Sequence, residues 1–129
     1  MARVAITVFA MSQALPEQVR RFLLTSIPTV PHLEMLLLLW RDSTQAWSSE
    51  AIAARLYISS GLADRIAEDL WKADFFECDG YPRQYRCHRT PSLSALLAVV
   101  DTAYLQSLRE VSLFIHSNPN RMAIRFDCN

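Results

Sequence analysis

The sequence predicts a mainly α-helical domain that carries one small β-hairpin. Three observations predict this class. About half of the 129 residues are apolar, enough to bury the core of one domain without disulfides or a metal ion. Only two glycines occur, too few for a glycine-rich β protein. Residues 48 to 89 have the pattern of two short helices followed by an arginine-rich hairpin.

Two helices are expected before that stretch. Residues 13 to 27 place apolar side chains on one helical face, and Pro28 then stops the helix. The next helix, from 31 to 40, is apolar on most of its circumference, which places it at the centre of the domain. A very short strand at residues 46 to 47 is expected to follow. The tryptophans are interpreted as core residues.

The central stretch predicts two helices joined by a tight turn. Ser48 or Ser49 is suited to cap the first helix, which ends near residue 56. The turn covers residues 57 to 59, and the second helix covers 60 to 72. Apolar residues recur on one face of this second helix at four-residue steps: Leu62, Ile66 and Leu70.

A hairpin and a final helix complete the predicted domain. Residues 75 to 89 form the hairpin, with the turn signal Asp79-Gly80 near its tip. Residues 92 to 117 predict one long helix, because apolar residues recur along it at steps of three and four. Pro119 follows its end and cannot continue it.

Composition also bears on location and domain limits. Three cysteines make an odd count, which favours a reducing, cytoplasmic compartment over a secreted disulfide scaffold. No apolar run approaches the ~20 residues of a membrane span, so no membrane partner is expected. Residues 1 to 12 are predicted to be a flexible leader or edge segment and 118 to 129 a tail. The domain is therefore expected to cover residues 13 to 117.

No pattern of catalytic residues is present. His32, His88 and His116 lie far apart in sequence, and no Ser-His-Asp, H-E-x-x-H or glycine-rich phosphate motif occurs. Cys78, Cys87 and His88 do not have the spacing of a recognisable zinc site. We therefore expect no enzyme activity, no cofactor and no metal.

The two hairpin cysteines allow two interpretations. Cys78 and Cys87 are equidistant from the centre of the hairpin, so a symmetric register would make them cross-strand neighbours. Such neighbours can form a disulfide, and a redox switch is conceivable. Alternatively, they are two small buried residues beneath the hairpin. The expected compartment favours reduced thiols.

The order of elements resembles the winged helix-turn-helix transcription regulators of bacteria, broadly the MarR-like and PadR-like groups. The resemblance covers residues 13 to 117 and rests on this order and on the stretch SSEAIAARLYISSGLADRIAEDL. It implies a recognition helix at 60 to 72, a wing at 75 to 89, and a homodimer formed by the helices at 13 to 27 and 92 to 117. The chain departs from the MarR pattern, because its wing lacks an Asp-x-Arg-Gly-like run and only one long helix follows the wing.

The resemblance implies double-stranded DNA as the partner. Cations and hydroxyl groups on the recognition helix and wing suit base edges and phosphates. The candidate DNA contacts are Ser60, Arg65, Lys72, Arg83, Arg86 and Arg89. The candidate dimerisation contacts lie on one face of the last helix, namely Leu97, Val100, Tyr104, Leu108, Val111 and Ile115.

Charge leaves a second function open. The formal net charge is zero, whereas DNA-binding domains usually carry a basic excess. Between residues 58 and 76, two basic side chains stand against four acidic ones. The alternative is a winged-helix adaptor that binds a protein and not DNA. The leading prediction remains a homodimeric DNA-binding transcription regulator.

Overall fold

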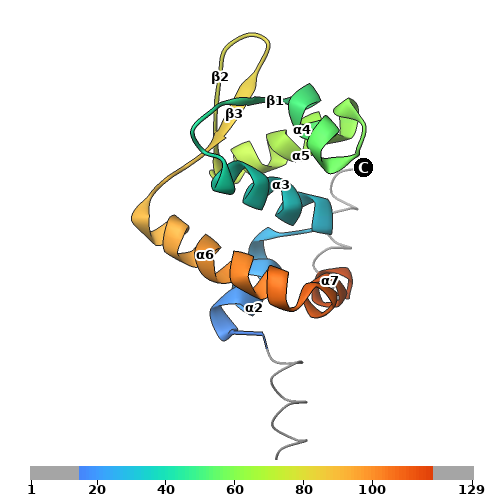
Figure 1. The fold of residues 1–129 in the computed structure, drawn as a ribbon, viewed down its shortest axis with the longest axis vertical. Coiled ribbons are helices and arrows are strands. Elements are labelled where there is room, and N and C mark those ends of the chain that lie inside the picture. Colours follow the sequence, from blue (N-terminus) through green and yellow to red (C-terminus); the bar gives the residue numbers. More distant parts are fainter. Residues whose placement is uncertain (1–14, 118–129) are drawn as a thin grey trace, which may run out of the picture. The chain divides into compact units, whose positions relative to one another are not determined.

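The computed structural model describes residues 15–117, and the predicted leader and tail lie outside them. The described residues belong to two compact units, one covering Val30–Leu97 and the other formed by the chain up to Thr29 and from Ala98 onward. Figure 1 shows the elements of both units. In chain order they are α2 (Glu17–Ser26), α3 (Val30–Arg41), β1 (Trp47–Ser48), α4 (Ser49–Leu56), α5 (Ser60–Lys72), β2 (Phe76–Asp79), β3 (Gln84–Cys87), α6 (Pro91–Gln106) and α7 (Leu108–His116).

Helix α3 forms the core of the Val30–Leu97 unit. It packs against α4, α5 and β3, and Leu33, Leu36 and Leu37 are completely buried. An apolar circumference of this kind requires neighbours on several sides, which these elements supply. The prediction of a central apolar helix is therefore confirmed.

Helices α4 and α5 form the predicted helix-turn-helix. Ser48 accepts a hydrogen bond from the Ala51 amide at 3.1 Å, and Ser59 accepts one from the Leu62 amide at 3.1 Å, so each helix begins at a serine cap. Tyr57 ends α4 in the left-handed conformation, with φ 58°. On α5, Ile66 and Leu70 are buried, which confirms the predicted inward-facing stripe at these two positions, whereas Leu62 is half-buried.

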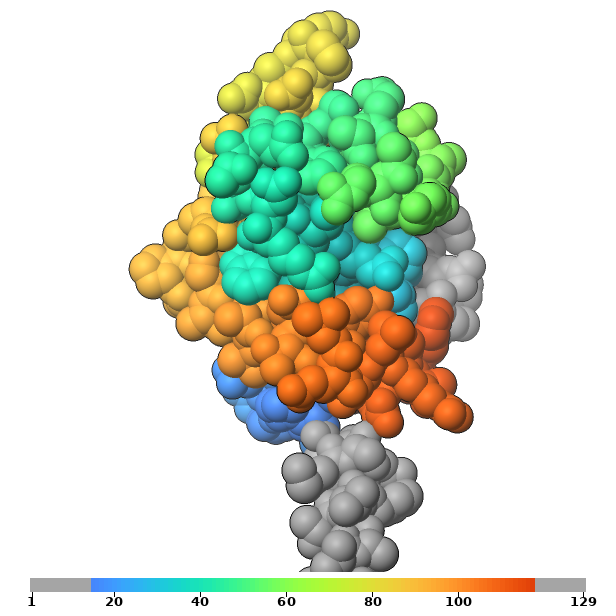
Figure 2. Space-filling view, in the orientation of Figure 1, coloured from blue at the N-terminus to red at the C-terminus, as the bar shows by residue number. Residues whose placement is uncertain are grey.

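A small antiparallel sheet forms the wing. Its strand order is β1-β3-β2, so β3 is central and β2 is an edge strand. Tyr85 on β3 and Phe76 on β2 are buried with their rings 6.2 Å apart. Figure 2 shows the hairpin projecting beyond the helices of its own unit. These elements confirm the mainly α winged helix-turn-helix fold.

The register of the hairpin corrects the symmetric pairing of its cysteines. Cys87 lies opposite Phe76, and Cys78 lies opposite Tyr85. The loop runs from Gly80 to Arg83, with Gly80 at φ 84°, and its centre lies closer in sequence to Cys78 than to Cys87. The two thiols are therefore not cross-strand neighbours, and both are free.

The second unit corrects the prediction of one long final helix. The chain leaves helical geometry at Ser107, with φ −135° and ψ 48°, and α7 begins at Leu108. A serine in a helix competes with backbone hydrogen bonding and has modest helix propensity. The break also changes the helical phase, because Leu108 is 54% exposed whereas Tyr104 and Val111 are buried. On one straight helix these three residues would share a face.

Helix α2 belongs to this second unit and packs against α7. It is shorter than the predicted helix at 13 to 27, because it begins after Pro16 and ends at Ser26, before Pro28. Among residues 15–117, no single helix is long and apolar enough to span a membrane. Within that range, only the consecutive helices α2 and α3, which are separated by a bend, reach that length and apolar composition together.

Candidate nucleic-acid interface

The start of α5 exposes a small polar surface. Ser60, Gly61 and Arg65 are exposed, and a Cβ added at Gly61 would meet nothing within 4 Å. The amides of a helix N-terminus favour phosphate groups. The Arg65 guanidinium has no ion-pair or hydrogen-bond partner within residues 15–117. This end of α5 can therefore offer a hydroxyl group and a cation to an approaching partner.

The wing carries three exposed arginines in three different situations. Arg86 points outward from β3 and has no partner in the described part of the chain. Arg89, just after β3, donates a hydrogen bond to the Trp40 carbonyl oxygen at 3.0 Å. Arg83, just before β3, is held by side chains of α5. The predicted wing cations are therefore not equivalent.

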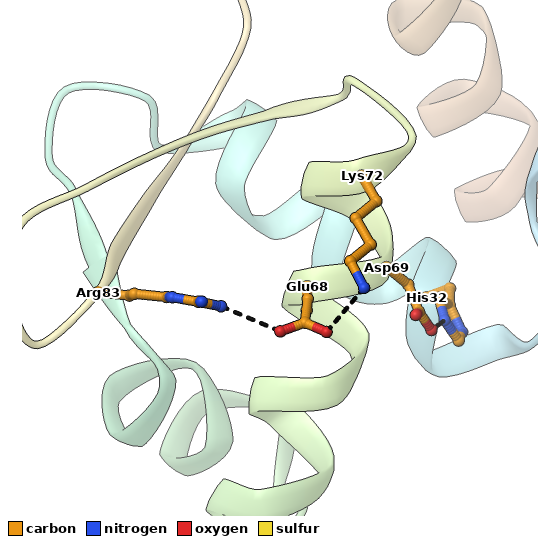
Figure 3. A network of polar contacts seen from close by, with 5 residues as sticks. All are labelled: His32, Glu68, Asp69, Lys72 and Arg83. Carbon is orange, nitrogen blue, oxygen red and sulfur yellow. Dashed lines mark hydrogen bonds and ion pairs between the residues drawn. The ribbon is translucent and has the colours of Figure 1, made fainter. Parts of the chain in front are cut away.

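Glu68 on α5 lies between two cations (Figure 3). Lys72, four residues further along the helix, is 3.1 Å from one carboxylate oxygen, and Arg83 donates to the other at 3.0 Å. Hydrogen bonds from Lys72 and then Arg83 lower the pKa of Glu68. The three side chains together carry a net positive charge. Glu68 therefore repels phosphate far less than an unpaired carboxylate at this position would.

Asp69 and Asp64, the other two acidic residues of α5, also have partners. His32 on α3 bonds Asp69 at 2.8 Å, seen beside Glu68 in Figure 3. The His32 ring is buried, and that burial lowers its pKa although Asp69 acts in the opposite direction. Asp64 accepts a hydrogen bond from the Ser49 hydroxyl at 2.9 Å. All three carboxylates of α5 are therefore engaged within their own unit.

Trp71 corrects the interpretation of the tryptophans as core residues. It is 37% exposed, and the Arg83 guanidinium lies 5.1 Å from its ring centroid. Sequence reasoning missed this contact and the Arg83–Glu68 pair. The partners are 12 and 15 residues apart on different elements, so helical spacing gives no signal for either.

The described cysteines do not form a redox pair in this geometry. Cys87 is buried, and burial raises its pKa to about 11, so its thiol stays protonated and unreactive. Cys78 is half-buried on the other strand, opposite Tyr85. Within residues 15–117, no group of three or more His, Cys, Asp or Glu side chains is arranged to hold a metal ion.

The predicted dimerisation residues are mostly buried in a single chain. Leu108 is exposed, whereas Leu97, Val100, Tyr104, Val111 and Ile115 are buried. The break at Ser107 explains the difference for Leu108. In the unit that contains α7, the side chains of Leu105 and Leu113 are 70% and 57% exposed. The apolar surface open to a second chain therefore differs from the predicted stripe.

The same unit contains an open groove of about 460 Å³. It runs along the second half of α6 beside Leu15 and Pro16. Its polar lining comes from Thr102, Gln106 and Ser107, and no charged side chain contributes to it.

Helix α3, the helix-turn-helix and the three-stranded wing define a winged helix-turn-helix domain. No protein-family model matches the sequence, and no curated protein matches it. Among solved structures, the chain is similar to a MarR family protein from Bacillus stearothermophilus, with a TM-score of 0.44 and 12% identity. The similarity covers 98% of this chain and 84% of that one.

Proposed function

We propose that this chain is a homodimeric winged-helix regulator that binds double-stranded DNA in the cytoplasm. Helix α5 enters the major groove with Ser60 and Arg65, and the wing approaches the sugar-phosphate backbone with Arg86. Lys72, Arg83 and Arg89 add positive charge around this surface. DNA binding of this kind requires neither enzyme activity nor a cofactor.

One observation carries this proposal: every carboxylate of α5 is engaged within its unit, whereas Arg65 and Arg86 have no partner among residues 15–117. A phosphate approaching α5 therefore meets available guanidinium groups and carboxylates already bonded to donors. Guanidinium groups bind phosphates bidentately and also read guanine edges. Of the three carboxylates, Glu68 is also neutralised by the cations Lys72 and Arg83, whereas Asp64 and Asp69 are bonded to a hydroxyl group and an imidazole.

The alternative function, a winged-helix adaptor that binds a protein, also has a specific observation in its favour. Tyr57 and Tyr81 are almost fully exposed, at the turn before α5 and in the wing loop. In addition, α5 and residues 76 to 89 together contain five cations and five carboxylates, which is no net charge. Exposed tyrosines are enriched in protein interfaces.

DNA binding is tested by fluorescence anisotropy with a labelled duplex across a salt series from ~50 to ~200 mM, because released counterions set the salt dependence. Replacing Arg86→Ala should reduce the slope of log K against log salt by roughly 0.9, the value for one phosphate contact. Replacing Arg65→Ala, beside the groove, should instead relax sequence preference.

Arg20→Ala is the matched control, because Arg20 is an exposed arginine on α2, outside the proposed interface. It should leave the slope unchanged. If the unaltered protein does not bind duplex DNA at ~50 mM salt, where electrostatic attraction is weakly screened, the DNA proposal fails and the adaptor function is favoured.

A further inference from the structure

Arg83 differs from the other wing arginines because it contacts two side chains of α5. Its guanidinium donates to Glu68 at 3.0 Å and lies 5.1 Å from the Trp71 ring centroid. A planar guanidinium can make a hydrogen bond in its plane and stack with its face at the same time. Figure 3 shows the Arg83 side chain reaching from the wing toward α5.

The position of Arg83 in the wing gives these contacts a mechanical consequence. The hairpin has two strands of four residues each, and a hairpin of that size is marginal by itself. The β1–β3 pairing holds the loop-side half of β3, with Ser48 opposite Gln84, whereas the base of the hairpin is fixed by the His88 amide, which bonds the Phe75 carbonyl at 2.9 Å. Arg83 ends the loop at the opposite end of the hairpin. It therefore adds a link from the loop end of the wing to the recognition helix, next to the strand pairing at Gln84.

We propose that Arg83 is a positioning residue that, with Glu68 and Trp71, clamps the wing on α5, and that it is not a phosphate contact. The part of this inference that concerns DNA rests on the proposed function above. The clamp fixes where Arg86 stands relative to Arg65. The guanidinium groups of Arg65 and Arg86 then approach a duplex in one fixed arrangement. Binding does not have to include the entropic cost of ordering the wing.

The clamp itself is tested without DNA, by hydrogen exchange of the wing amides in the free protein. Arg83→Ala and Glu68→Gln should each accelerate exchange in residues 76 to 87 by about three- to ten-fold, because the first removes an exposed ion pair and a stacking contact and the second weakens the ion pair. The double variant should exchange no faster than Arg83→Ala, since Arg83→Ala already removes the ion pair that Glu68→Gln weakens.

Two matched controls make the exchange result decisive. Arg86→Ala removes a neighbouring wing arginine, and Asp64→Asn removes a neighbouring carboxylate of α5, yet neither takes part in the clamp. Both should leave wing exchange unchanged. If Arg83→Ala exchanges no faster than Arg86→Ala, the clamp does not hold the wing and the inference is overturned.

The second measurement separates positioning from phosphate contact. In duplex binding, Arg83→Ala should lower the affinity by a similar factor at every salt concentration and keep the slope of the unaltered protein. Arg86→Ala should reduce the slope by roughly 0.9. A reduction of that size for Arg83→Ala, restored by Arg83→Lys, would make Arg83 a phosphate contact. Absence of any duplex binding would refute the proposed function, while the exchange result would still decide the clamp.

Discussion

Glu68 illustrates how the charge of a residue depends on its partners. In the sequence it contributes to an acidic excess between residues 58 and 76. In the structure both of its carboxylate oxygens accept hydrogen bonds from cations, one of them 15 residues away. Counting charges along the chain therefore misjudges the surface that a phosphate would meet.

His32 should make the stability of the protein depend on pH. Burial lowers its pKa in the folded state below the ordinary value of 6.5. The unfolded chain then binds more protons than the folded chain as the pH falls below about 6.5, so the free energy of unfolding decreases on acidification. The contribution of His32 is fully present above that pH and is lost as the pH falls through the folded pKa.

Urea unfolding of the unaltered protein and of His32→Gln, between about pH 7.5 and pH 5, checks this sign. The stability advantage of the unaltered protein should shrink as the pH falls, while the other histidines act equally in both. An advantage that grows on acidification would mean that the ion pair with Asp69 outweighs burial and raises the pKa.

At the scale of elements, local signals predicted the fold well. The serine caps of α4 and α5, the four-residue steps of Ile66 and Leu70, and the Asp79-Gly80 turn all lie within a few residues of the structure they specify. Helix capping and periodicity depend on near neighbours, so one sequence is enough to detect them.

The features that were not predicted depend on distant contacts or on competing local preferences. The break at Ser107 interrupts a continuous apolar pattern that fits one helix equally well. The hairpin register depends on the geometry of a loop beginning at Gly80. In the candidate site, the residue types were predictable, but the partners of Arg83 were not, because they come from another element.

The turn between α4 and α5 contains a backbone strain that can be removed. Tyr57 has φ 58° and ψ 44° and its side chain is 94% exposed. A left-handed residue with a Cβ costs roughly 1–2 kcal/mol, whereas glycine adopts this conformation readily but loses more entropy on folding. Tyr57→Gly should therefore raise the free energy of unfolding by about 0.5–1 kcal/mol.

Tyr57→Ala is the control for this prediction, because it removes the same aromatic ring but keeps a Cβ at positive φ. It should give no gain in stability. Both variants are compared by the midpoint of urea unfolding at constant m-value. Equal stability of the glycine and alanine variants would show that strain at Tyr57 is not the cause.

At the scale of the whole molecule, dimerisation should depend on the exposed leucines and not on the buried stripe. Leu105, Leu108 and Leu113 are each more than half exposed. Burying one leucine contributes about 1.5–3 kcal/mol, and a carboxylate in its place adds a desolvation cost. Leu108→Asp should therefore weaken the dimer at least about tenfold and yield monomers in light scattering at micromolar concentration.

Tyr81→Asp controls for the loss of any exposed apolar group, since Tyr81 is fully exposed in the wing loop. This variant should remain dimeric. Because Leu108 is exposed in the single chain, Leu108→Asp should also keep the thermal stability of a folded monomer. A monomeric unaltered protein would contradict the proposed assembly.

The place of β2 at the edge of its sheet has a consequence for solubility. An edge strand presents unpaired amides and carbonyls that can pair with another chain. Glu77 and Asp79 project from this strand and are exposed. Two such strands meeting edge to edge would bring like charges together, and this repulsion opposes the growth of intermolecular sheets. The carboxylates that reduce the positive charge of the wing thus also protect it against aggregation.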